Sequence, residues 1–154
     1  MRYYDAEIKI AALAAAKTVL YITVPANKLV TLVSSGITDA SNVTNQQLEA
    51  TWQKVTTLGT PTGTTLTPAK HDLGDSVAGS TVVGNVTASE PTYTANTDLG
   101  HDAAPMLSGW YFPMNPLPVA SLPVFTGGDT WGLRMLSTPT AFDAIIRVTF
   151  GEQG

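Results

Sequence analysis

Two short runs near the C-terminal end, residues 131–135 and 146–150, alternate apolar residues with polar or small ones. The apolar members are Trp131, Leu133 and Met135 in the first run and Ile146, Val148 and Phe150 in the second. Successive side chains of a strand point to opposite faces, so each run predicts a half-buried β-strand. Residues 137–141 lie between them and contain hydroxyls and Pro139, which favour a turn. We therefore predict an antiparallel pair, introduced by the Gly-Gly-Asp turn at 127–129.

The same alternation recurs upstream. It predicts an outer strand over residues 3–10 and a strand over 48–53 whose Trp52 faces inward. Residues 19–24 and 29–33 are rich in β-branched side chains and are separated by the turn-forming Pro-Ala-Asn-Lys at 25–28. That spacing predicts a tight hairpin. Both of its runs are apolar on both faces, so we expect the hairpin to lie centrally or under a covering loop.

The segments between these strands are less regular. Residues 11–17 have the best helix propensity in the chain but are too few for a stable isolated helix, so a turn or an irregular strand extension is equally open. Residues 58–68 are Gly, Thr and Pro at most positions, which predicts an exposed loop. Residues 72–78 are expected to close one helical turn, with Asp72 or Asp75 as its N-cap.

Two further segments complete the chain. Short β-prone runs are predicted at 81–87, broken at Gly84-Asn85, and at 92–94. Residues 106–125 begin apolar and aromatic and then carry several prolines, each of which removes a ladder donor. We expect this segment to be an extended connection over the end of the fold rather than an inner strand.

Many short strands, turns at close intervals and no convincing long helix predict an all-β fold, an antiparallel β-sandwich or small barrel. The 154 residues fit a single domain, 1–154, which can bury a core without disulfides. There is no cysteine, so thiolate metal sites and a cysteine nucleophile are excluded.

The charge pattern bears on partners. A net charge of −4 gives no basic face for phosphates, so we expect no nucleic-acid partner. Only 13% of residues are charged, about half the usual quarter. Sparse surface charge favours association, which points to coverage by identical copies or a larger assembly, although a hydroxyl-rich surface can also solvate itself.

No membrane segment is expected either. The apolar stretch 8–24 is short and is interrupted by Lys9 and Lys17, and the first residues lack the order of a signal peptide. We therefore expect synthesis in a cytoplasm, with any later destination reached by assembly.

Candidate catalytic and metal residues are few. His71 and His101 each stand beside an aspartate, Asp72 and Asp102, and imidazole with carboxylate is an ordinary metal-binding pair. The two histidines lack zinc-motif spacing and lie in polar stretches, which favours solvated loop residues over ligands. No serine stands in a Gly-x-Ser-x-Gly motif. We predict no catalytic residue, no metal and no cofactor.

The aromatic residues are the better candidates for a binding surface. Trp110, Tyr111 and Phe112 are consecutive, so their rings point to both faces of an extended segment, and at least one ring is exposed unless both faces are covered. Tyr3 and Tyr4 at the N-terminal end raise the same possibility, as an arm that docks on another subunit. The candidate partner contacts are thus Tyr3, Tyr4, Trp110 and Tyr111, with burial of all the rings as the alternative.

The chain also resembles a group of small tailed-phage structural proteins. The resemblance rests on Gly109-Trp110 with its following aromatics, the proline-broken segment, the Gly-Gly turn, an apolar-Arg-apolar strand and a final strand ending in Gly-Glu. Upstream, residues 67–75 followed by 77–81 are similar to the loop before a middle strand of that group.

This resemblance implies a jelly-roll-like sandwich with long Gly/Thr/Pro-rich loops on the virion, a capsid decoration (cement) protein without enzymatic activity. It implies that the major capsid protein is the partner and that the chain forms a homo-oligomer, for which a trimer suits three-fold positions of the shell. Three alternatives remain open. The chain is a receptor- or glycan-binding module, a head-tail or tail component, or a hydrolase in which His71 or His101 meets a carboxylate in a cleft.

Overall fold

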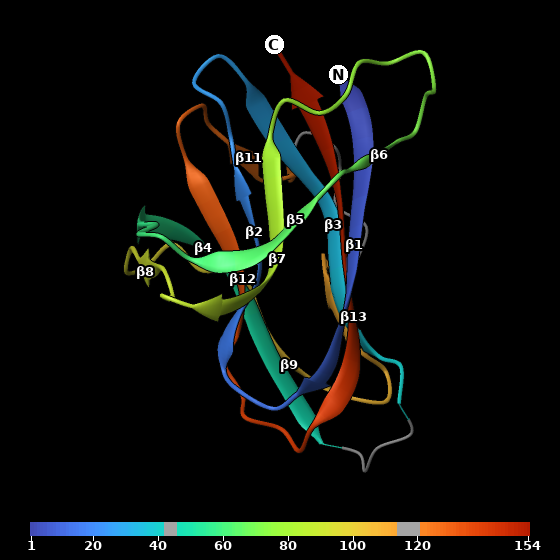
Figure 1. Ribbon diagram of the computed structural model, residues 1–154, viewed down its shortest axis with the longest axis vertical. Helices are drawn as coiled ribbons and strands as arrows, with labels where there is room; N and C mark the ends of the chain where they lie inside the picture. The colour runs from blue at the N-terminus through green and yellow to red at the C-terminus, as the bar shows by residue number, and fades with distance from the viewer. Residues whose placement is uncertain (42–45, 114–120) are drawn as a thin grey trace.

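The computed structural model describes residues 1–41, 46–113 and 121–154, and strands with their connecting turns make up these ranges, without an α-helix (Figure 1). Two antiparallel sheets pack face to face. The first sheet contains β10 (Trp110–Phe112), β3 (Leu29–Asp39), β13 (Phe142–Gln153), β1 (Arg2–Leu13) and β6 (Ala69–Lys70) in that spatial order, with β11 (Val124–Phe125) also paired to β3. The second sheet contains β5 (Thr62–Leu66), β7 (Thr81–Ala88), β2 (Lys17–Thr23), β12 (Thr130–Met135), β4 (Gln47–Thr57) and β8 (Thr92–Tyr93), with β9 (Leu99–Pro105) also paired to β4. The predicted all-β sandwich is confirmed.

The path of the chain is that of a jelly roll. In the first sheet β1, β13, β3 and β10 are neighbours, and in the second β2, β12, β4 and β9 are neighbours. Numbered along the chain as eight principal strands, these orders are 1-8-3-6 and 2-7-4-5, the two four-stranded sheets of a doubled Greek key. The longer strand β7 and the short strands β5, β6, β8 and β11 extend the sheets beyond these principal strands.

Both hairpins predicted from neighbouring runs are wrong in pairing. β2 and β3 lie in different sheets, as do β12 and β13. The turn at 25–28 forms, with the Lys28 N–H donating to the Pro25 carbonyl at 3.0 Å, but it carries the chain across the end of the sandwich. Strands that are consecutive in sequence therefore face one another through the core, because the jelly roll wraps the chain around both sheets.

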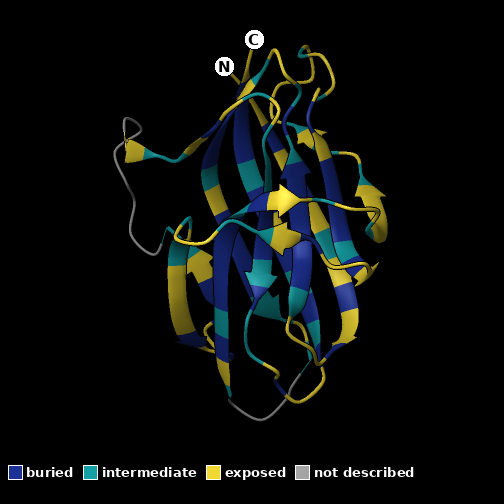
Figure 2. Cartoon of the chain, turned by 90° about the vertical axis from the view of Figure 1, so that its left-hand side faces the viewer, coloured by how far each residue is buried: buried dark blue, intermediate teal, exposed yellow. Residues whose placement is uncertain are grey.

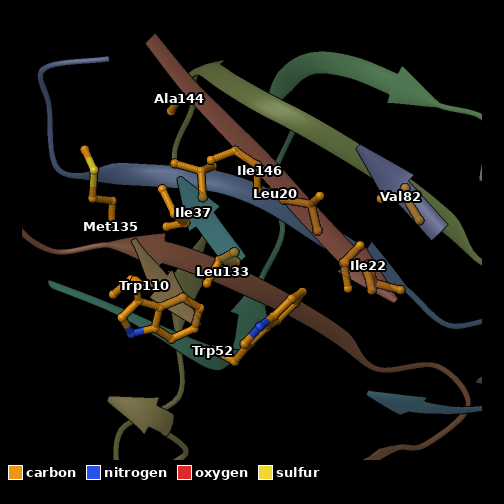
Figure 3. Packing of buried hydrophobic residues seen from close by; sticks show 14 of the residues in the cluster. Leu20, Ile22, Ile37, Trp52, Val82, Trp110, Leu133, Met135, Ala144 and Ile146 are labelled. Atoms are coloured by element: carbon orange, nitrogen blue, oxygen red, sulfur yellow. The ribbon is translucent and has the colours of Figure 1, made fainter. Parts of the chain in front are cut away.

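The predicted faces of the strands are confirmed. Leu133 and Met135 on β12 and Ile146, Val148 and Phe150 on β13 are buried, although Trp131 is only partly so. Trp52 is fully buried, and its indole N–H donates across the sandwich to the Ser35 hydroxyl of β3 at 2.7 Å. Figure 3 shows Trp52 and Trp110 with Leu133 in this core, and Figure 2 shows buried and exposed positions alternating along the strands.

At residues 11–13 the strand-extension alternative is confirmed, because these residues continue β1 and form no helix. Other irregular segments differ from expectation. Within 58–68, residues 62–66 form the exposed edge strand β5 rather than only a loop. Residues 72–78 make no helical turn; instead the Asp72 carboxylate accepts the Gly74 N–H at 2.8 Å and closes a tight turn. β7 is not broken at Gly84-Asn85 as predicted. It continues through both residues, although Asn85 adopts a positive φ of 53°.

The described pieces of the proline-rich segment are not inner strands, as predicted. These pieces, β10 and β11, both pair with β3 at the edge of the first sheet. The prediction for residues 114–120 lies outside the described residues.

Candidate functional site

The four tyrosine and tryptophan candidates separate by burial. Tyr4 and Trp110 are fully buried, and the Tyr4 ring stacks on Phe150 with centroids 5.5 Å apart. Tyr3 and Tyr111 are 37% and 49% exposed. Strand alternation explains the split, because neighbouring residues of β1 and of β10 point to opposite faces. Tyr4 and Trp110 thus belong to the core, and only Tyr3 and Tyr111 present a ring to a partner.

Tyr3 and Tyr111 lie on the same surface, the outer face of the first sheet. The strand register places Tyr111 of β10 opposite Gly36 of β3, Gly36 opposite Arg147 of β13, and Arg147 opposite Glu7 of β1. One row of side chains therefore crosses four strands, from an aromatic ring to an ion pair. The Arg147 guanidinium donates to the Glu7 carboxylate at its far end.

The adjacent row along the strands is polar. Ser34 of β3 stands opposite Thr149 of β13, and Thr149 stands opposite Asp5 of β1. The Thr149 hydroxyl donates to Asp5 Oδ1 at 2.6 Å, and Asp5 Oδ2 lies 2.7 Å from His71 Nε2. Tyr3 follows on β1, opposite Gly151. We call this surface, from Tyr111 to Tyr3 with the two rows between them, the tyrosine face.

A hollow of about 220 Å³ opens on the tyrosine face beside Tyr111. Its lining includes the Tyr111 ring, Gly36, Ser34, Arg147 and Thr149. It is smaller than the 300–1,000 Å³ typical of sites for drug-sized ligands. A hollow of this size and mixed polarity suits one small polar ring or chain segment.

Each histidine meets a carboxylate, but not in the order of a catalytic triad. His71 meets Asp5, and Asp5 in turn accepts from Thr149, so the carboxylate lies between the hydroxyl and the imidazole. In a nucleophile-base-acid triad the imidazole must bond to the hydroxyl, because it is the imidazole that takes the proton. His101 meets Glu49 at 2.7 Å, with both side chains about half exposed. Both histidines form exposed hydrogen bonds to carboxylates, and neither pairs with the aspartate next to it in sequence.

Within the described residues, no group of three or more His, Asp or Glu side chains is arranged to hold a metal ion. The same described part of the chain contains no helix long and apolar enough to cross a membrane.

A second surface feature is the loop of residues 71–80, which lies with both chain ends at one end of the sandwich (Figure 1). It displays Leu73 and Val77, which are 87% and 73% exposed. We call these ten residues the terminal loop. Single exposed apolar side chains are common on protein surfaces, but two large ones on one ten-residue loop make that loop a candidate contact.

The terminal loop is held in place along its length. Arg2 pairs with Asp75 at 3.4 Å and donates to the Ser76 hydroxyl at 2.9 Å. The Tyr4 hydroxyl donates to the Ser76 carbonyl at 3.0 Å, and the Lys70 ammonium donates to the Asp75 carbonyl at 2.8 Å. These bonds tie the loop to β1 and β6, so Leu73 and Val77 are presented on a fixed backbone.

Glu152 anchors the other end of the terminal loop. Its side chain is only 3% exposed and accepts from the Gly79 N–H at 3.0 Å and from the Ser80 N–H and hydroxyl at 2.8 and 2.7 Å. Lys28 lies 3.6 Å away. Burial alone would raise the pKa of this carboxyl group, but the hydrogen bonds and the Lys28 charge together hold the pKa below its ordinary value.

Sequence reasoning missed the terminal loop as a display surface. Its residues are common turn formers, and the available signal was Leu73 and Val77, two large apolar residues inside a polar stretch. It also missed that Tyr3 and Tyr111 lie on the same face of the first sheet, because their placement depends on the order of the strands and not on any local pattern.

Comparisons with family models, curated proteins and solved structures found no match to this chain.

Proposed function

We propose that this protein is a non-enzymatic virion structural protein that decorates the outside of a phage capsid and stabilises it. The major capsid protein is its partner and the capsid surface its location, reached by assembly after synthesis in the host cytoplasm. Neither nucleic acid nor membrane is a partner in this proposal. A homo-oligomer, with a trimer at three-fold positions of the shell, agrees with the closed symmetry of most soluble oligomers.

The observation that carries the proposal is the terminal loop. Two large apolar side chains are displayed on a backbone fixed by Arg2, Lys70 and Glu152, so docking them loses little conformational entropy. Burying each one contributes about 1.5–3 kcal/mol. Repeated over many equivalent lattice positions, modest contacts of this kind add up to a large resistance against opening of the shell.

The low charge content supports the same role. With 13% charged residues, the surface offers little repulsion to a neighbouring protein. The long antiparallel ladder between β1 and β13 gives a stiff body behind the docking end.

Two measurements test the proposal. The first is the ratio of this chain to the major capsid protein in purified particles from its source. A ratio close to that of the shell protein is expected, since only the shell offers so many equivalent sites. A ratio typical of a tail or portal component would overturn the decoration role in favour of adsorption or head-tail joining.

The second measurement is binding of variants to shells that lack this chain. Leu73→Asp with Val77→Asp should weaken binding at least about tenfold, because two apolar contacts are replaced by charges. Leu107→Asp is the matched control. Leu107 is 67% exposed but follows β9, near Gln46 and Thr140 at the opposite end of the sandwich, and its binding should stay unchanged. Equal binding by all variants would exclude the terminal loop as the docking surface.

A further inference from the structure

We propose that the tyrosine face binds a neutral saccharide, with one sugar ring seated on Tyr111 and the rest of the chain directed across the sheet towards Tyr3. This inference goes beyond the capsid role and does not depend on it, since the tyrosine face and the terminal loop's apolar side chains are separate sets of residues.

Tyr111 is built as a platform. A Cβ at Gly36 would lie 2.9 Å from Tyr111 Cδ1 and 3.1 Å from Cε1, and a Cβ at Gly109 would lie 3.1 Å from Cε2. Two glycines therefore leave room for the ring to rest against the backbone of the sheet. The ring is still 49% exposed. One side of the Tyr111 ring rests on the sheet and the other side is open to solvent. The C–H groups of a sugar ring can pack on that open side.

Tyr3 repeats the arrangement on β1. A Cβ at Gly151 would lie 2.6 Å from Met1 Sδ and 3.1 Å from Tyr3 Cε1, so the Tyr3 ring also approaches the backbone of this sheet at a glycine, beside the Met1 side chain. Tyr3 is 37% exposed, and its ring centroid lies 6.1 Å from that of His71. Tyr111 lies three strands from β1, about 14 Å, and its row ends at Glu7, four residues or about 13 Å along β1 from Tyr3, so the two rings are about 20 Å apart on one face. This spacing suits an oligosaccharide rather than a single ring.

Polar groups lie where the hydroxyls of a sugar would need them. The hollow beside Tyr111 is lined by Ser34, Arg147 and Thr149. The Arg147 guanidinium uses its Nε to reach Glu7, which leaves its other nitrogens as donors, and the Thr149 oxygen can still accept while it donates to Asp5. The hydroxyl groups of a bound sugar therefore replace their hydrogen bonds to water with hydrogen bonds to the protein.

The charges of the tyrosine face select a neutral ligand. Its carboxylates are Asp5 and Glu7, and its one guanidinium, Arg147, is already paired. Phosphates of a nucleic acid would meet two carboxylates, Asp5 and Glu7, and a single guanidinium that is already paired. The inner strands β3 and β13 carry ladder partners on both sides, so an extended peptide could add only at the edge strand β10 and not over the hollow between them.

The test is a titration of the whole chain with three neutral probes, maltotetraose, cellotetraose and N-acetylchitotetraose, and one acidic probe, trigalacturonate. Backbone amide shifts in NMR report the site, and the shift curves report Kd. We expect at least one neutral probe to shift residues 34–36, 111 and 147–149. Tyr111→Ala should weaken that probe at least about tenfold, while Tyr111→Phe, which keeps the ring, should stay within about threefold.

Thr64→Ala, on the exposed strand β5 of the other sheet, is the matched control and should bind as the parent does. Retained amide shifts elsewhere establish that each variant is folded. Three results would overturn the inference: no shift with any neutral probe at about 10 mM, binding of trigalacturonate alone, or binding that survives Tyr111→Ala unchanged.

Discussion

Glu152 is the most consequential single side chain outside the apolar core. It is a buried carboxylate whose donors, Gly79 and Ser80, belong to the terminal loop, so it joins the last strand to the surface that the capsid proposal uses. Glu152→Gln places an amide N–H₂ among groups that are themselves donors. Leaving such groups unsatisfied costs about 1–3 kcal/mol, so we expect the free energy of unfolding to fall by that amount in urea denaturation.

Glu7→Gln is the matched control, because Glu7 is also paired but its side chain is 51% exposed. Exposed pairs contribute about 0–1 kcal/mol, so this variant should be close to the parent. Equal effects of the two substitutions would mean that Glu152 contributes no more than a surface pair, and the anchoring role would have to be abandoned.

β1 of the first sheet contacts β7 of the second sheet at Gly84, which packs against the Ile8 side chain. A Cβ at Gly84 would lie 2.8 Å from Ile8 Cγ2 and 3.0 Å from Cδ1. Gly84→Ala should therefore destabilise the protein by about 1–3 kcal/mol through overpacking. In an Ile8→Ala background the two clashing atoms are gone, and the cost of Gly84→Ala should largely disappear. A double-mutant cycle of unfolding free energies measures this coupling.

Gly74→Ala serves as the control for this cycle, since the nearest atom to its new methyl group is the flexible Asp72 carboxylate at 3.3 Å. We expect a change within about 0.5 kcal/mol. Additive effects of Gly84→Ala and Ile8→Ala would show that the two strands do not press on each other at this point.

The faces of the strands could be predicted, but their partners could not. Alternation is a local property, so the inward sides of Trp52, Leu133 and Val148 follow from the sequence. Pairing is not local. The turn at 25–28 has the length of a hairpin, and only packing of the whole chain decides that it crosses between sheets. The jelly-roll detail came from the resemblance and agrees with the strand order.

The candidate site was predictable to a similar extent. Consecutive aromatic residues indicate that one ring is exposed, and Tyr111 is that ring. Which of two neighbours faces out depends on the register with β3, and the sequence of β10 alone does not contain it. The partners of His71 and His101 show the same limit, because Asp5 and Glu49 are distant in sequence and are brought near by sheet pairing and by loop placement.

Taken together, the two sheets have different surfaces. The first sheet carries the tyrosine face, and the terminal loop lies at one end of that sheet, where its His71 adjoins Tyr3 and Asp5 while Tyr111 lies three strands away (Figure 1). A decoration protein arranged in this way can hold a shell and still offer a sheet face to a saccharide. The two proposals are thus compatible, and each is tested by its own variants.

Ionisable groups predict how the stability of the entire fold responds to acid. Burial raises the pKa of Asp129 and of Glu152, but hydrogen bonds and nearby ammonium groups outweigh it, so both pKa values are lowered on folding. A lowered pKa contributes stability above the unfolded value, here 3.8 for Asp and 4.5 for Glu, and that contribution is lost as pH falls through the folded value. The free energy of unfolding should therefore decline below about pH 5.

The alkaline side has the opposite sign and a different cause. Burial raises the pKa of Tyr93 to about 12, and it also raises the pKa of Tyr21, from an ordinary value of 10.0. A raised phenol pKa contributes stability that is fully present below the unfolded value and is lost as pH rises through the folded one. Urea denaturation across pH should give a plateau between the two limbs, with the alkaline decline between pH 10.0 and about 12. Glu152→Gln should make the acid limb shallower and leave the alkaline limb unchanged, because it removes one carboxylate and no phenol while Asp129 remains. Tyr93→Phe should make the alkaline limb shallower and leave the acid limb unchanged, because Tyr21 remains. If either substitution flattened the opposite limb, the assignment of the limbs to these groups would be wrong.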